Sequence, residues 1–290
     1  MTRAISLLYH DVYASDPAES GFVSDAANRY KLSMAAFEAQ LDGVVKVRDD
    51  RPILIGRADE HSTQSSLQSN GHEDQKAPWL ITFDDGGVSY HTAIADRLEA
   101  RGWLGHCFVT TNQIGQQGFL DTAQLRELDA RGHVIGSHSA SHPTRFSACS
   151  YSQMVDEWRQ SRAVLEDILG HAVTVASIPG GYFSPAVARS AQEAGIAVLF
   201  TSEPVTAIDA DPITLVGRFT IRLGDRPDAS MRLVSPAPWA RGDAWLRWNA
   251  KGLVKPLLGP AYMRVADWVH AFRGEPRPVA STDLPGGRSS

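Results

Sequence analysis

Residues 79–87 read Trp-Leu-Ile-Thr-Phe-Asp-Asp-Gly-Gly, a strand-like run that ends in two carboxylates and two glycines. After it, apolar runs typical of buried strands alternate with amphipathic segments that end at glycine, as helices commonly do. Such alternation predicts parallel βαβ units, and five or more of them indicate a barrel or a doubly wound sheet. The further strands are expected at 106–110, 134–138, 173–178 and 197–201.

Polar residues gather where the expected strands end. Asp84-Asp85 follows 79–83, His10-Asp11 follows a first apolar run at 4–9, and His138 ends the run at 134–138. In both fold alternatives, ligands bind at the carboxyl ends of the parallel strands. We therefore expect a single site at that edge of the sheet.

The segment 138–143, His-Ser-Ala-Ser-His-Pro, is the sharpest local signal. Two histidines four residues apart lie on one face of a helical turn and can share a metal ion. At the end of the 79–83 strand, one carboxylate can complete a His₂Asp site while its neighbour faces water as a general base. Three protein ligands with an open position are typical of catalytic zinc. Taken singly, the motifs have plainer interpretations: a chance pair among ten histidines, and an Asp-Asp-Gly turn.

Together, TFDDG at 82–86 and HSxSHP at 138–143 resemble the motifs of the polysaccharide deacetylases of carbohydrate esterase family 4, over about residues 5–222. The resemblance implies a distorted (β/α) barrel with about seven parallel strands. It also implies that Asp84 is the general base. Asp85, His138 and His142 would bind the metal, expected to be Zn²⁺ or another divalent transition metal.

The third family motif departs from its usual form, Arg-x-Pro-Tyr, whose arginine holds the base. Here the segment reads Ser177-Ile178-Pro179-Gly180-Gly181-Tyr182, so serine replaces the arginine and two glycines displace the tyrosine. Glycines allow backbone N–H groups to approach a developing oxyanion. We expect Gly180, Gly181 and Tyr182 to line the oxyanion or substrate site. The alternative is a strand-to-helix loop that only needs flexible glycines.

The second departure is the missing C-terminal Leu-x-His, whose histidine usually serves as general acid. Leu8-Tyr9-His10 supplies this string at the other end of the chain. In this respect the sequence is similar to the circularly permuted poly-N-acetylglucosamine deacetylases, which begin with a strand carrying Tyr-His-Asp-Val. Since the first and last strands of a closed barrel are neighbours, the resemblance implies that His10 is the general acid. A structural histidine beside Asp11 is the alternative.

The remaining segments predict the domain organisation. We expect a catalytic domain over 1–235, with an exposed or disordered insertion at 56–77, then an amphipathic helical appendage over 236–274 and a disordered tail over 275–290. Residues 241–273 combine tryptophans and leucines with six Lys or Arg and two Asp. This mixture suits either packing on the barrel or peripheral contact with an anionic membrane.

Composition excludes several classes of protein. A net charge of −5 argues against a nucleic-acid binder, and two cysteines cannot form a disulfide scaffold. The sequence shows neither a secretory apolar region at its start nor the roughly 18 apolar residues of a membrane span. We expect a cytoplasmic protein, with peripheral contact at the inner membrane as an open alternative.

These features predict a metal-dependent hydrolase that removes N-acetyl groups from amino sugars of a polysaccharide or its lipid-linked precursor, in exopolysaccharide metabolism. Two other functions stay open. The same site can hydrolyse an O-acetyl ester or another amide, and the altered third motif is also consistent with a barrel that only binds glycan.

Overall fold

The computed structural model describes residues 2–56, 77–181, 183–210, 213–237 and 239–258. The chain divides into two compact units, Met1–Trp245 and Leu246–Ser290. The domain boundaries expected at 235 and 274 stay predictions. The expected insertion at 56–77 and the tail at 275–290 lie almost wholly or wholly outside the described residues.

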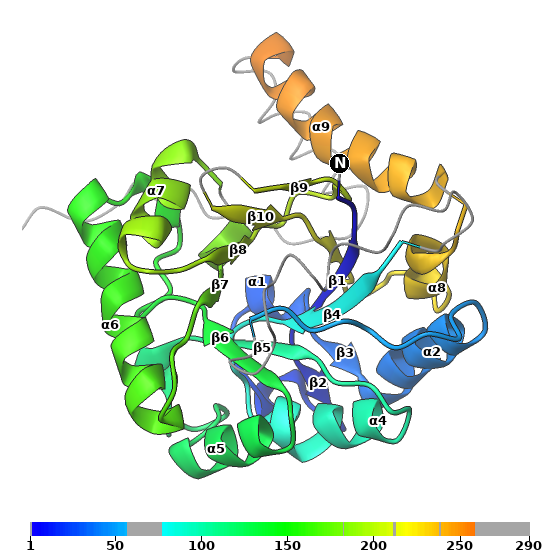
Figure 1. The fold of residues 1–290 in the computed structure, drawn as a ribbon. Coiled ribbons are helices and arrows are strands. Elements are labelled where there is room, and N and C mark those ends of the chain that lie inside the picture. The colour runs from blue at the N-terminus through cyan, green and yellow to red at the C-terminus, as the bar shows by residue number, and fades with distance from the viewer. Residues whose placement is uncertain (1, 57–76, 182, 211–212, 238, 259–290) are drawn as a thin grey trace, which may run out of the picture. The chain divides into compact units, whose positions relative to one another are not determined.

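A nine-stranded sheet in the order β11-β1-β4-β5-β6-β7-β8-β10-β9 forms the centre of the first unit. It curls round a central axis (Figure 1), and only the β9–β10 pair is antiparallel. The predicted distorted (β/α) barrel is confirmed, although the described residues contain eight parallel strands where about seven were expected. The strands are β1 (Ile5–Tyr9), β4 (Trp79–Phe83), β5 (His106–Val109), β6 (Val134–Ser137), β7 (Val175–Ser177), β8 (Val198–Phe200), β9 (Ile208–Asp209), β10 (Thr214–Val216) and β11 (Phe219–Thr220).

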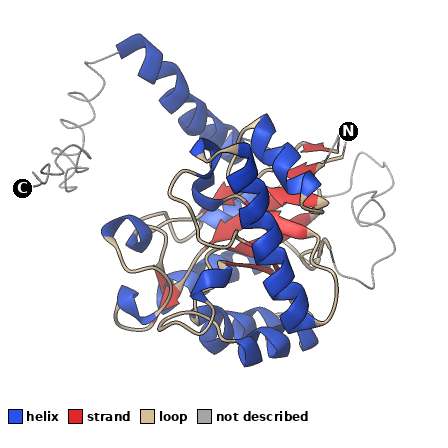
Figure 2. Ribbon diagram, turned by 90° about the vertical axis from the view of Figure 1, so that its left-hand side faces the viewer, coloured by secondary structure: helices blue, strands red, loops and turns tan. Residues whose placement is uncertain are grey.

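Helices cover the outer face of this sheet (Figure 2). They are α2 (Met34–Val45), α4 (Ala95–Glu99), α5 (Thr122–Ala130), α6 (Tyr151–Leu169), α7 (Pro185–Glu193) and α8 (Ala229–Val234). The start and stop signals in the sequence act as expected. Ser33 caps α2 by accepting from the N–H of Ala36, and α6 ends at Gly170, whose φ is 77°.

Shorter elements connect these layers. The π-helical turn η2 (Tyr90–Ile94) leads into α4, and a two-stranded sheet joins β2 (Val12–Tyr13) to β3 (Leu32–Ser33). The others are α1 (Asp25–Asn28) and the 3₁₀ turns η1 (Pro17–Glu19), η3 (Thr111–Gln113), η4 (Phe146–Ala148) and η5 (Pro179–Gly181). The sequence did not predict β2, β3, β9, β10 or β11, because two or three residues are too short to display a period of two.

The described part of the C-terminal helical appendage is α9 (Trp239–Leu258). Several large apolar side chains of this helix are exposed: Trp239, Trp245, Leu246 and Trp248. Among the residues that the structure describes, no helix has both the length and the apolar character needed to cross a membrane.

The first strand closes the curled sheet. β4 pairs with β1 along its whole length, so other segments must share the opposite edge of β1. Near its carboxyl end, Leu7 pairs with Phe219 of β11. Near its amino end, Arg3 forms an antiparallel bridge with Ala207, and the N–H of Ala4 donates to the carbonyl of residue 206 at 2.9 Å. The two edges of the sheet, at β11 and next to β9, therefore both contact the first strand or the residues just before it.

Alternation along the strands separates an outer core from an inner one. In β4, Trp79, Ile81 and Phe83 pack in the cluster that includes the helices, whereas Leu80 packs in a cluster drawn from strands all round the barrel. That inner cluster consists of Ala4, Ile55, Leu80, Phe108, Val134, Val175, Val198, Phe200, Ile208 and Val216. The phase of each strand thus decides which residues face the barrel axis.

The outer core holds the ends of β1 and β4 in place. Phe37 of α2 is fully buried, with ring centroids 5.5 Å from Tyr9 and 6.0 Å from Phe83. These two residues directly precede His10 and Asp84. We expect Phe37→Ala to lower the free energy of unfolding by about 3–5 kcal/mol, because it leaves a cavity among aromatic rings.

Urea unfolding followed by circular dichroism measures this change. Val45→Ala in the same helix is the matched control, since Val45 is 50% exposed, and it should change stability by less than about 0.5 kcal/mol. A loss below about 1 kcal/mol for Phe37→Ala would contradict the packing argument.

Candidate active site

A layer of polar side chains lies above the inner core, at the carboxyl ends of the strands. Side chains two residues apart on a strand face the same side, so every second residue after an inner-core residue also faces the barrel axis. Five inner-core residues, in or next to the strands, lead by this rule to a polar residue: Ala4, Leu80, Val134, Val175 and Val216. The polar residues are, in the same order, His10, Asp84, His138, Ser177 and Arg218.

Asp85, His138 and His142 bring three ligand atoms within 4.8 Å of one another. The Nε2 atoms of His138 and His142 lie 3.4 and 3.6 Å from Oδ1 of Asp85. Ligands placed tetrahedrally at about 2.1 Å from an ion are about 3.4 Å apart, so these separations are those that a transition metal requires. The donor set and its spacing fit Zn²⁺ or a similar divalent ion.

Hydrogen bonding orients the first histidine for this role. Nδ1 of His138 lies 3.0 Å from the carbonyl oxygen of Ser177, which selects the tautomer that donates from Nδ1. Nε2 is then left with a lone pair directed toward Asp85 and His142. The ring of His142 packs against Phe22, with centroids 5.0 Å apart, which limits its rotation.

The expectation that the two histidines share a helical turn is wrong. Residues 138–142 form an irregular loop, in which Ser139 and His142 have left-handed φ values of 64° and 55°. Glu157 of α6 anchors the loop by accepting from the N–H and hydroxyl of Ser141 at 2.8 and 2.6 Å. The loop, rather than helical periodicity, brings the imidazoles together.

A left-handed backbone interrupts the strand alternation at Asp85, so that Asp85 and Asp84 both reach Nε2 of His138, at 3.4 and 4.0 Å. Asp85 has a φ of 78°, and Gly86 follows it at 80°. Within the described chain, the non-glycine residues with positive φ are Asp85, Ser139 and His142, all of which belong to this site. This conformation costs about 1–2 kcal/mol per residue, and strain of this kind gathers at functional sites.

Asp84 is buried and held by Arg218. The guanidinium donates to Oδ1 at 2.7 Å and to Oδ2 at 2.9 Å, and the hydroxyl of Ser177 donates to Oδ2 at 3.0 Å. Burial favours the neutral acid, but the charge and hydrogen bonds of Arg218 outweigh it and lower the pKa of Asp84 below its ordinary value. Asp84 is therefore ionised near neutral pH.

Arg218 is the site residue that the sequence analysis missed. Its guanidinium is fully buried and also donates to Ser177 Oγ at 2.7 Å and to the carbonyl of Thr201 at 2.8 Å. The small serine at 177 leaves room for the guanidinium of Arg218, which comes from the segment between β10 and β11. The available signal was a lone arginine in the apolar run Leu215–Ile221, because a charge in a buried strand requires a partner.

His10 is half-buried at the carboxyl end of β1, in the strand next to the one that carries Asp84. Burial lowers the pKa of His10, against the opposing charges of Asp85 and Asp84. Its Nδ1 is buried without a hydrogen-bond partner, and its ring packs against Tyr30 with centroids 4.7 Å apart. The alternative partner, Asp11, instead accepts from the hydroxyls of Ser20 and Ser89 at 2.6 and 2.8 Å.

The predicted oxyanion segment forms the turn η5. Gly180 and Gly181 both have left-handed backbones, with φ values of 65° and 69°. The N–H of Gly181 donates to the carbonyl of Ile178 at 3.1 Å and is thus engaged within the turn. Gly180 is exposed, and Tyr182 lies outside the described residues.

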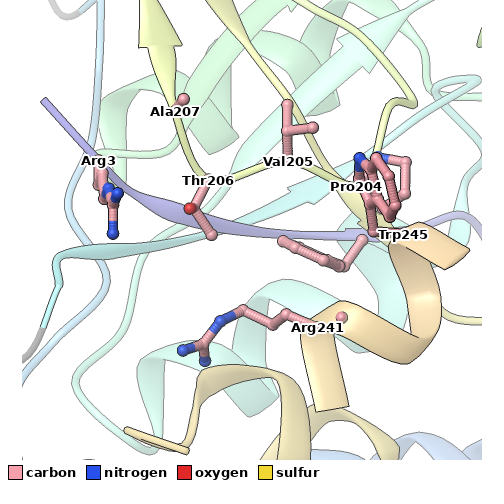
Figure 3. Close-up of a pocket in the computed structure, with 9 residues that line it drawn as sticks. Arg3, Pro204, Val205, Thr206, Ala207, Arg241 and Trp245 are labelled. Carbon is pink, nitrogen blue, oxygen red and sulfur yellow. The ribbon is translucent and has the colours of Figure 1, made fainter. Parts of the chain in front are cut away.

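A cavity of about 340 Å³ lies at the other end of the barrel strands (Figure 3). Arg3, which precedes β1, lines it together with Thr206, Arg241 and Trp245. The guanidinium of Arg241 binds the end of α8, where it donates to the carbonyls of Leu233 and Ser235 at 2.7 and 2.6 Å. None of the predicted site residues lines this cavity, so it is separate from the polar layer.

The sequence is similar to those of known polysaccharide deacetylases. Residues 71–199 match the family model for polysaccharide deacetylase. The chain is 26% identical over 128 residues to YxkH of Bacillus subtilis (strain 168), a protein assigned to the polysaccharide deacetylases, which covers 44% of this chain and 46% of YxkH. It is 30% identical over 106 residues to a chitin deacetylase of Pestalotiopsis sp, covering 37% and 34% of the two chains. The chain thus spans less than half the length of these curated relatives.

The fold comparison covers more of the chain. The structure of the Streptococcus pyogenes deacetylase PplD in complex with acetate aligns with a TM-score of 0.65 at 18% identity. The alignment covers 81% of this chain and 99% of PplD, so the two share the barrel fold.

The ion pair at the centre of the layer predicts a pH-dependent stability. Arg218→Met removes the charge at similar volume and leaves a buried carboxylate, which should cost about 3–5 kcal/mol at pH 7. Without the arginine, burial raises the pKa of Asp84, so the folded variant binds a proton that the unfolded chain does not. The loss in free energy of unfolding, relative to the original protein, should therefore become smaller as the pH falls from about 7 to about 5.

Urea unfolding at both pH values measures this loss. Arg226→Met is the matched control, because Arg226 pairs with Asp228 at the surface and should contribute less than about 1 kcal/mol. A loss that is small at pH 7, or that does not change with pH, would show that Asp84 does not depend on Arg218.

Proposed function

The chain carries a polysaccharide deacetylase domain, and on that premise we propose that it is a metal-dependent hydrolase of N-acetylated glycans. It would remove N-acetyl groups from amino sugars of a polysaccharide or its precursor. The observation that carries the proposal is the convergence of Asp85, His138 and His142 beside the ionised Asp84. A ligand set with an adjacent buried base is what hydrolysis of an unactivated amide requires.

Asp85, His138 and His142 would hold the ion. The chemistry that such an ion supplies when bound is polarisation of the acetamide carbonyl and a lower pKa for the attacking water. The two histidines present Nε2 and the aspartate presents Oδ1. Phe22 packs on the ring of His142 and supplies an apolar neighbour to the ligand cluster.

Asp84 would take the proton of the attacking water. Its Oδ2 lies 4.0 Å from Nε2 of His138, so the base stands directly beside the ligand cluster. Arg218 and Ser177 fix the orientation of the carboxylate, which avoids reorganisation when the proton moves.

His10 would donate a proton to the departing amine. His10 follows the strand next to the one that carries Asp84, and its imidazole is close enough to Asp85 and Asp84 for their charges to act on it. An amine leaves poorly as an anion, so an acid on this side is needed for the carbon–nitrogen bond to break. Of the predicted oxyanion and substrate-binding residues, we retain Gly180 and Tyr182, because the N–H of Gly181 is already bonded.

The substrate class follows from the relatives. One of them is a chitin deacetylase, so an N-acetylglucosamine polymer is the first substrate to test. An O-acetyl ester or another amide stays the alternative for the same site, and a glycan-binding barrel without turnover stays the non-catalytic alternative.

Membrane contact through residues 241–273, a lipid-linked substrate, a role in exopolysaccharide metabolism and a cytoplasmic location stay predictions. The exposed Trp239, Trp245, Leu246 and Trp248 of α9 favour contact with an apolar or interfacial surface.

Acetate release from N-acetylglucosamine oligomers tests the proposed activity. We expect release by the zinc-loaded protein, its loss on chelation and its recovery when Zn²⁺ is restored. Asp84→Asn should lower kcat by about 10²- to 10⁴-fold with the metal content unchanged, since an amide cannot accept the proton. Asp129→Asn, which alters a carboxylate beside His171 and outside the site, should leave kcat near its original value.

Each other outcome points to one of the alternatives. Release from O-acetylated glycans alone would make the protein an esterase. Glycan binding without release of acetate from any substrate would make it a binding barrel. Full turnover by Asp84→Asn, with its metal content verified, would remove Asp84 from the role of base.

The proposed acid predicts a difference between two leaving groups. His10→Ala should abolish hydrolysis of an N-acetyl amide while sparing an aryl acetate, because a phenolate leaves without protonation. Rates on the two substrates, measured side by side at equal metal content, check this. Equal losses on both would assign His10 a structural role instead.

A further inference from the structure

Arg222 lies at the carboxyl end of β11, beside the acid side of the site. β11 pairs with β1, and the N–H of Ile221 donates to the carbonyl of Leu8 at 2.8 Å. His10 follows two residues after Leu8 on the neighbouring strand. Arg222 and His10 therefore emerge from adjacent strands at the same edge of the barrel.

The guanidinium of Arg222 has no acidic partner. Arg218 and Arg226 pair with aspartates, but in the described part of the chain Arg222 forms neither an ion pair nor a side-chain hydrogen bond. Its Nε is buried without an acceptor. The nearby Asp225 accepts from the backbone N–H of Arg222 at 2.8 Å instead. A buried donor without an acceptor among the described residues is unusual in a folded protein. Arg222 as a whole is only half-buried, and no described group accepts a hydrogen bond from its guanidinium, which therefore stays available to an oxyanion.

Aromatic contacts hold this free guanidinium in place. Its Cζ lies 5.4 Å from the ring centroid of Tyr30, within the range of a cation–π interaction. The same tyrosine ring packs against the imidazole of His10 at 4.7 Å. The N–H of Leu223 donates to the carbonyl of Arg29 at 2.9 Å, which ties the two segments together. The charge is therefore pre-positioned next to the proposed acid.

We infer that Arg222 binds an oxyanion of the substrate, so that the glycan carries a negative charge close to the acetylated amino sugar. The inference rests on the proposed function and specifies its substrate class. A planar guanidinium binds a carboxylate or a phosphate through paired N–H donors. A hexuronic acid residue and a phosphodiester link both supply such an oxyanion. The exposed Arg29, also without an ion pair among the described residues, adds positive charge at this rim.

Three oligosaccharides of similar length test this substrate class. The first is a neutral N-acetylglucosamine oligomer, the second alternates N-acetylglucosamine with a hexuronic acid, and the third joins N-acetylated sugars through phosphodiesters. We expect kcat/KM for one of the anionic substrates to exceed that for the neutral one by about tenfold or more. The anionic substrate that shows the preference identifies which oxyanion is bound.

Arg222→Gln should lower kcat/KM for the preferred anionic substrate by about tenfold or more, to near that for the neutral oligomer. The loss should appear mainly as a higher KM, because a contact remote from the reacting bond contributes to binding rather than to the chemical step. Activity on the neutral oligomer should not change, which also shows that the variant is folded. Arg222→Lys should retain part of the preference. The matched control is Arg226→Gln, which removes a surface arginine and should retain all of it.

Equilibrium binding of the same oligosaccharides to the full chain separates the two proposals. If no substrate releases acetate but Arg222→Gln weakens binding of an anionic oligosaccharide, the deacetylase proposal fails and the anion site stands. If acetate is released equally from all three substrates, or if Arg222→Gln keeps the original preference, the anion site is wrong and the deacetylase proposal stands.

Discussion

The buried ion pair between Asp84 and Arg218 is the contact on which the candidate site depends. A carboxylate inside a barrel loses its hydration, and only a close positive charge with matched hydrogen bonds keeps it ionised there. Arg218 meets this need with two N–H donors to Asp84 and a third to Ser177. Because Ser177 also offers its carbonyl to His138, the pair is joined to the metal-ligand cluster by one short network.

The curl of the sheet makes this network possible. Arg218 lies between β10 and β11, which stand at opposite ends of the parallel part of the sheet, and Asp84 follows β4, two places from β11. Because the sheet curls, the side chains of Arg218, Asp84 and Ser177 all face the same axis. The apolar inner core fills the barrel below them, so the polar layer lies only at the carboxyl ends of the strands.

The first strand connects this layer to the acid side. β1 pairs with β4 on one edge and with β11 on the other, so His10 has Asp84 on one flank and Arg222 on the other. Along the rim, the proposed ligand His138 is thus followed by Asp84 and Asp85, then by the proposed acid His10, and last by Arg222. This order suits a substrate whose acetamide lies over the ligand cluster while the rest of the glycan extends past His10.

The sequence alone was enough to predict the alternation of strands and helices, helix ends at glycine such as Gly170, and the position of His10, Asp84 and His138 at one edge of the sheet. These depend on local patterns: periods of two and 3.6, and the residues that end elements. The tertiary structure was needed to show how Arg218 replaces the arginine missing at position 177, that His138 and His142 meet through a strained loop, and that Arg222 has no acidic partner among the described residues. Each of these is a contact between segments distant in the chain or a backbone conformation that such contacts impose, and neither leaves a periodic trace in the sequence.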